Sequence, residues 1–75
     1  VFPNPVRNEF FLESNIPLFE PYLIDNLGRV LQLEARLLRE GIYHLQAPPL
    51  PSGVYWLFAK THQGLIGRKI IFLQP

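Results

Sequence analysis

One stretch of the chain decides the fold class: Val54-Tyr55-Trp56-Leu57-Phe58-Ala59-Lys60-Thr61. It is rich in aromatic side chains, which favour the extended backbone of a strand. Successive side chains of a strand point to opposite faces, so two sets are expected here. One set should face the core: Tyr55, Leu57 and Ala59. The other should face away from it: Trp56, Phe58 and Lys60.

The rest of the chain divides into short apolar runs separated by turn signals. No stretch holds an apolar period of 3.6 for three turns, so strands are predicted and helices are not. Strands are expected at residues 9–13, 18–25, 29–34, 42–46 and 65–73, with a loop or a short strand at 35–40. Six or seven short strands at this spacing are typical of an all-β fold, an Ig-like antiparallel β-sandwich without the immunoglobulin disulfide.

Asp, Gly and Pro mark the turns. The sequence Asp25-Asn26-Leu27-Gly28 predicts a tight turn, because Asp can bond its own backbone and Gly28 can adopt a positive φ. We expect the carboxylate of Asp25 to pair with Arg29 across that turn.

Two further proline signals shape the expected strands. Pro51-Ser52-Gly53 predicts a turn that leads into the central strand, where the Tyr55 hydroxyl should find a partner at the edge of the sandwich. Pro21 cannot donate to a ladder, so it is expected at an edge or a bulge, or where the run at 18–25 splits in two.

Composition limits the core and the class of partner. The 75 residues begin at Val1 and include no methionine, which predicts a single domain excised from a longer protein. Apolar residues make up 48% of the chain, more than so small a core can hide, so an exposed apolar partner site is expected. The net charge of +1 with scattered basic residues argues against nucleic acid, and no apolar run approaches the roughly 20 residues of a membrane span.

No residue pattern points to catalysis or metal binding. His44 and His62 have no serine or cysteine in a recognisable catalytic setting, since Ser14 and Ser52 both lie in turn sequences. The six carboxylates are spread thinly, without an Asp-rich loop. We therefore predict no enzyme activity, no metal site and no cofactor.

The closing strand is apolar on both faces, and basic residues stand beside it. A terminal strand of this kind is a candidate for docking by strand addition or by face contact. The alternative is that residues 48–51 cover its second face. The predicted partner-binding residues are Trp56, Phe58, Arg68, Lys69, Ile70, Ile71, Phe72 and Leu73.

Four pieces of the sequence occur in a characteristic order: Val1-Phe2-Pro3-Asn4-Pro5, Leu23-Ile24-Asp25-Asn26-Leu27-Gly28-Arg29-Val30, Leu50-Pro51-Ser52-Gly53-Val54-Tyr55-Trp56-Leu57 and Arg68-Lys69-Ile70-Ile71. Together they resemble the C-terminal sorting domain of proteins exported by the type IX secretion system of Gram-negative bacteria, over nearly the whole chain. The motif residues are Pro3, Asn4, Pro5, Asp25, Gly28, Arg29, Pro51, Gly53 and Tyr55.

The resemblance implies that residues 1–75 form the C-terminal sorting domain of a larger exported protein. Such a domain is recognised in the periplasm and passes its cargo across the outer membrane to the cell surface or the medium. The implied partners are the type IX translocon, outer-membrane shuttle proteins and a surface sortase that commonly cleaves upstream of the domain, although some members keep it. Family members commonly end with a basic residue, whereas this chain ends Phe72-Leu73-Gln74-Pro75, which leaves Arg68 and Lys69 to supply the positive charge.

Two functions of other classes also fit the composition. An adhesive or carbohydrate-binding sandwich could stack Trp56, Tyr43 or Tyr22 on a sugar ring. A dimerisation appendage could use edge strands and surplus apolar area for self-association.

Overall fold

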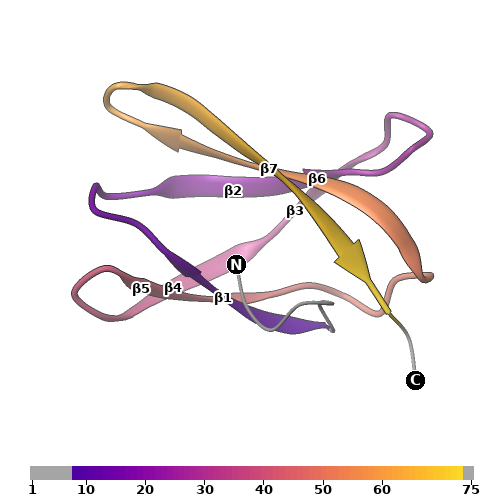
Figure 1. Cartoon of the computed structure of the whole chain (residues 1–75), viewed down its shortest axis with the longest axis horizontal. Helices are drawn as coiled ribbons and strands as arrows, with labels where there is room; N and C mark the ends of the chain where they lie inside the picture. The colour runs from indigo at the N-terminus through magenta and orange to yellow at the C-terminus, as the bar shows by residue number, and fades with distance from the viewer. Residues whose placement is uncertain (1–7, 74–75) are drawn as a thin grey trace.

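The computed structural model describes residues 8–73, and all the regular structure among them is β-strand. The strands are β1 (Glu9–Glu13), β2 (Phe19–Ile24), β3 (Val30–Gln32), β4 (Glu34–Arg39), β5 (Ile42–Gln46), β6 (Gly53–Thr61) and β7 (Gly64–Phe72). They form two antiparallel sheets, one ordered β1-β5-β4 and the other β3-β2-β6-β7, which lie as two layers in Figure 1. The predicted antiparallel β-sandwich is confirmed.

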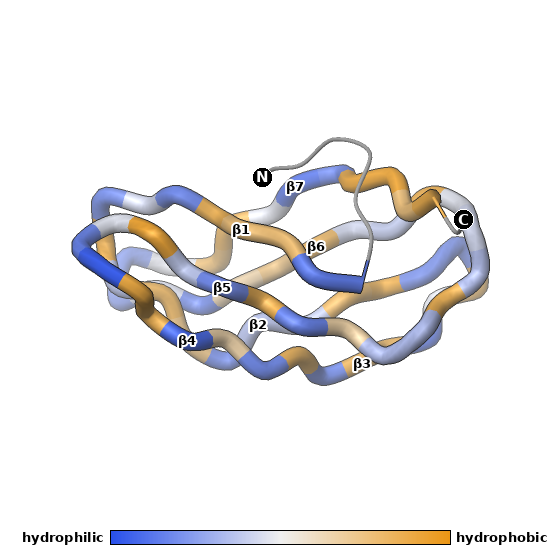
Figure 2. Tube along the Cα trace, turned by 90° about the horizontal axis from the view of Figure 1, so that it is seen from below, coloured by the Kyte–Doolittle hydropathy of each residue, from blue (hydrophilic) through white to orange (hydrophobic). Residues whose placement is uncertain are grey.

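The core fills the space between the layers with side chains from both. Phe72 of β7 packs edge-on against Phe10 of β1, with ring centroids 6.0 Å apart, and against Tyr55 of β6 at 4.9 Å. The predicted inner set of the central strand, Tyr55, Leu57 and Ala59, is buried. In the other layer β5 buries Tyr43 and Leu45, whereas β4 is exposed along its whole length. Figure 2 shows both hydrophobic and hydrophilic residues along these two strands.

Pro21 lies at a bulge, as one of the sequence-based alternatives predicted. The register of β2 against β6 shifts between Phe19 and Tyr22, and Glu20 has a positive φ of 51° at this point. The carbonyl of Pro21 accepts a hydrogen bond from the Leu33 amide at 3.0 Å. Because Pro21 lies in this bulge, where β2 and β6 are not in register, the ladder does not require the N–H that proline lacks.

The chain between residues 29 and 40 differs from the predicted single arm at 29–34. Strand β3 ends at Gln32, and β4 begins at Glu34 in the other sheet. Leu33, between them, is buried in the core. One inward-pointing leucine thus marks the crossing from one layer to the other. The stretch at 35–40, for which the sequence predicts a loop or a short strand, lies mostly in β4.

Candidate functional site

The outer face of the four-stranded sheet carries a row of large apolar side chains. Residues directly opposite each other in antiparallel strands lie on the same face. Trp56 of β6 lies opposite Ile24 of β2 on one side and Lys69 of β7 on the other, and Ile24 lies opposite Val30 of β3. Trp56 is 45% exposed, so folding leaves much of this indole in contact with water.

A second row runs through Phe58. Its ring stacks on Tyr22 of β2, with centroids 5.5 Å apart and an interplanar angle of 23°. On its other side Phe58 faces Gly67 of β7, where a Cβ would approach the ring atom Cε1 to 2.7 Å. The ring therefore occupies space that any other residue at position 67 would fill.

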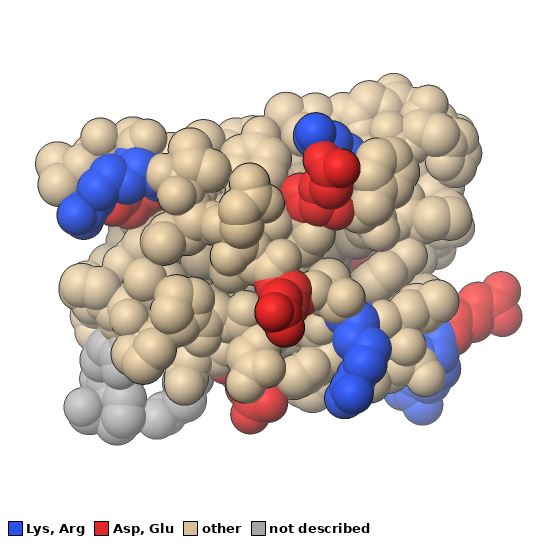
Figure 3. All heavy atoms as spheres, turned by 180° about the vertical axis from the view of Figure 1, so that it is seen from behind, with Lys and Arg blue, Asp and Glu red and all other residues tan. Residues whose placement is uncertain are grey.

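Further apolar residues extend the same face at its two ends. Val54 of β6 lies opposite Ile71 of β7, and Leu65 of β7 lies opposite Lys60. We call this surface the apolar face and define it by Tyr22, Ile24, Val30, Val54, Trp56, Phe58, Leu65 and Ile71. Figure 3 shows from behind that charged side chains gather in separate small clusters, with uncharged surface between them.

One ion pair lies on the apolar face beside Phe58. The Lys60 ammonium donates to Glu20 Oε2 at 2.6 Å, and this hydrogen bond raises the pKa of Lys60. Both side chains are more than half exposed, and such surface pairs contribute little to stability. Lys69, in contrast, has no carboxylate within ion-pair distance among residues 8–73.

Strand β7 is at the edge of its sheet, as its place in the order shows. Ile70 and Phe72 point into the core, whereas Ile71 and Leu73 are 45% and 48% exposed. The prediction that the closing strand carries apolar residues on both faces is therefore confirmed, with Ile70 and Phe72 on one face and Ile71 and Leu73 on the other. Since Ile70 and Phe72 are buried, a partner can reach them only through their backbone groups.

The segment at 48–51 does not cover the outer side of β7, which excludes that alternative. Leu50 packs against the core, and the carbonyl of Pro51 accepts a hydrogen bond from the Tyr55 hydroxyl at 2.8 Å. The expected partner for the Tyr55 hydroxyl is thus confirmed, and Ile71 remains exposed.

A cleft of about 560 Å³ opens between β7 and the region where β1 ends. Leu12, Ile16 and Ile66 supply its apolar lining, and Glu13 and Arg68 also line it. We call it the edge cleft. It lies along the side of the sandwich where β1 and β7 are the outermost strands of their sheets.

The turn after β2 is built on one carboxylate. Oδ1 of Asp25 accepts hydrogen bonds from the amides of Leu27 and Arg29, each at 2.9 Å, and Oδ2 accepts from Arg29 Nε at 2.6 Å. The bond from the Arg29 amide is the largest of the causes that lower the pKa of Asp25. Gly28 adopts the positive φ of 82° that the turn needs. The predicted turn and the Asp25–Arg29 pair are both confirmed.

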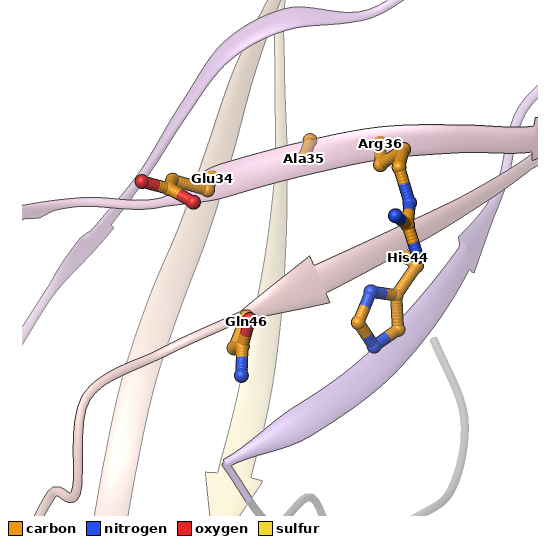
Figure 4. Close-up of a pocket in the computed structure, with 5 residues that line it drawn as sticks. All are labelled: Glu34, Ala35, Arg36, His44 and Gln46. Atoms are coloured by element: carbon orange, nitrogen blue, oxygen red, sulfur yellow. The ribbon is translucent and has the colours of Figure 1, made fainter.

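The outer face of the three-stranded sheet is polar by comparison. Its middle row runs from Phe11 through His44 to Arg36, and His44 Nε2 lies 3.0 Å from Glu9 Oε1. A hollow of about 360 Å³ on this face is lined by Glu34, Ala35, Arg36, His44 and Gln46. Figure 4 shows these five residues on the neighbouring strands β4 and β5. Among residues 8–73 no group of three or more His, Cys, Asp or Glu is placed to hold a metal ion.

The three aromatic residues named for sugar stacking do not form one platform. Tyr43 is buried, and its hydroxyl accepts a hydrogen bond from the Leu18 amide at 3.0 Å. Tyr22 has one face against Phe58. Trp56 alone of the three has an exposed ring without a stacked aromatic neighbour in the described part of the chain.

The structure brings four of the eight predicted partner-binding residues to one side of one sheet. Trp56, Phe58, Lys69 and Ile71 share the apolar face, and Arg68 lines the edge cleft. Pro3, Asn4 and Pro5 lie outside the described residues. Gly67 was not among the predicted residues, although a glycine inside a strand is a known signal of close approach.

Comparison with known protein families gives a match over nearly the whole chain. A family model described as the secretion system C-terminal sorting domain matches residues 1–73. No curated protein and no solved structure matches the chain. In the described part of the chain, no helix has the length and apolar character needed to cross a membrane.

Proposed function

Since the chain belongs to the secretion system C-terminal sorting domains, we propose that it carries a cargo protein across the outer membrane by docking its apolar face and strand β7 on the secretion machinery. Domains of this family mark proteins that the type IX secretion system exports to the cell surface or releases. The chain is therefore a C-terminal type IX sorting signal. Its route and its contact residues are the proposal.

The observation that carries the proposal is the apolar face. Antiparallel sheets with one solvated face usually show polar residues on that face. Here the solvated side of the four-stranded sheet exposes Trp56, Val30 and Ile71, which come from three strands. The middle row of the other sheet runs through His44 and Arg36, and its exposed leucines, Leu37 and Leu38, lie on the edge strand β4 alone. An exposed apolar patch rimmed by polar residues is typical of a protein-protein interaction site.

Partner recognition without chemistry is the role that we assign to the module. The family and the small all-β fold suggest a non-enzymatic function. We propose that the translocon and its outer-membrane shuttle proteins bind the domain, and that a surface sortase acts on the chain upstream of it. We also propose that residues 1–75 act as one C-terminal unit of a longer exported protein.

The test is a fusion of residues 1–75 to the C-terminus of a reporter that is otherwise retained in the periplasm. In cells with an intact type IX system we expect the reporter at the surface or in the medium. In matched cells that lack the translocon it should accumulate in the periplasm. Periplasmic retention in both strains, with a folded domain, would exclude the proposed function.

A further inference from the structure

Three of the four sheet edges among residues 8–73 carry features that discourage strand pairing. Strand β3 has only three residues. Strand β4 is interrupted by a register shift between Leu37 and Arg39, and β1 is five residues long with a glutamate at each end. Short length, irregularities and charges are the means by which proteins protect open edges.

Strand β7 lacks two of these protections. It has nine residues, and every one of them pairs with β6 in a single unbroken register. It also lies beside the edge cleft, whose apolar lining from Leu12, Ile16 and Ile66 could receive side chains of an added strand. Of the described edges, β7 is therefore the one best formed to accept another strand.

We propose that β7 binds an extended segment of a secretion-machinery protein as a fifth strand of the four-stranded sheet, and that this segment is acidic where it passes Arg68 and Lys69. The inference rests on the proposed function and names the chemistry of its partner. Backbone hydrogen bonds would provide the affinity, and the two basic residues would select the segment.

The charge requirement follows from where the two cations point. Arg68 lies opposite Leu57, a core residue, so it is on the inner side of the sheet and lines the edge cleft. Lys69 lies opposite Trp56, so it is on the apolar face. A matching strand therefore carries two consecutive acidic residues, one for each side of the sheet.

Neither cation is neutralised within the described structure. Arg68 Nη1 donates to the carbonyl of Gly67 at 2.9 Å, and no carboxylate among residues 8–73 forms an ion pair with Arg68 or Lys69. Glu13 lines the same cleft as Arg68 and is not paired with it. Both positive charges remain available to a partner.

A second copy of the chain is a poor fit for the same edge. If β7 pairs antiparallel with its copy over all nine residues, Arg68 lies directly opposite the other Arg68. Like charges in directly opposed positions destabilise a strand pair. Charge thus favours an acidic partner segment over self-association through β7.

Two synthetic nine-residue peptides test the inference on the purified domain. Both alternate threonine and valine, and they differ only at the centre, which is Glu-Asp in one and Lys-Arg in the other. Hydrogen-deuterium exchange of the β7 segment should slow with the acidic peptide, while that of β4 should not change. We expect the acidic peptide to bind about tenfold more tightly than the basic one, and the variant R68E/K69E should reverse this preference.

The inference is overturned if neither peptide protects β7, if both protect it equally, or if R68E/K69E keeps the preference of the original chain. Thermal unfolding of R68E/K69E, compared with the conservative variant R68K/K69R, checks that the domain remains folded. The reporter fusion separates the two hypotheses. If the R68E/K69E fusion is exported as well as the fusion with the unchanged domain, the acidic partner segment is excluded and the sorting function still holds. If the fusion with the unchanged domain is not exported, the sorting function itself is excluded.

Discussion

Gly67 lies directly opposite Phe58 across β6 and β7, and the Phe58 ring fills the space that a side chain at position 67 would need. We expect Gly67→Ala to destabilise the domain by about 1–3 kcal/mol, the usual cost of forcing extra volume into a packed position. In a Phe58→Ala background the same change should cost close to nothing, because the obstruction is gone. Urea unfolding of the unchanged domain, the two single variants and the double variant measures this coupling. Equal costs of Gly67→Ala in both backgrounds would show that the Phe58 ring does not exclude a side chain at position 67.

Truncation of two neighbouring side chains of β7 should change the free energy of unfolding by very different amounts. Phe72 is 1% exposed and packs on Phe10 and Tyr55, so Phe72→Ala should cost about 3–5 kcal/mol, comparable with the whole stability of so small a domain. Ile71 is on the opposite face, and Ile71→Ala should stay within about 0.5 kcal/mol of the original chain. Denaturant unfolding compares the two variants, and similar losses would contradict the assignment of faces.

The strand pattern was predictable because alternation is a local property of the sequence. Val54 to Thr61 indicates both an inner and an outer set before any partner strand is known, and the structure keeps that division. The turn at Asp25 was equally predictable from the sequence, since its hydrogen bonds span only four residues.

The errors concern relations between distant residues. The run at 29–34 reads as one strand, and only the packing of Leu33 into the core shows that the chain changes sheets there. In the last strand the sequence shows apolar residues on both faces, and a partner-binding role for Ile70 and Phe72 stays a prediction although their side chains are buried. The face of β7 that turns inward is set by contacts of Phe72 with Phe10 and Tyr55. These two residues lie in other strands, so the alternation within β7 cannot reveal them.

The Asp25 turn predicts a specific loss of stability in acid. Hydrogen bonds, chiefly from the Arg29 amide, lower the folded-state pKa of Asp25 below its ordinary value of 3.8. The stabilisation is therefore fully present above the unfolded-state pKa and disappears as the pH falls through the folded-state pKa. Asp25→Asn should reduce the decline in unfolding free energy below about pH 5. Parallel pH profiles for the two proteins would show that this carboxylate is not a source of the acid sensitivity.

The central claim is that the secretion machinery recognises the apolar face. Export of reporters fused to matched surface variants of the domain tests this claim most directly. Trp56→Ser/Ile71→Ser removes two exposed residues of the apolar face, and Leu37→Ser/Leu38→Ser removes two exposed leucines of the other sheet. Both variants should remain folded by circular dichroism, because these side chains are about half exposed. We predict that the apolar-face variant leaves the reporter in the periplasm while the leucine variant is exported normally. Normal export of a folded Trp56→Ser/Ile71→Ser fusion would contradict the account.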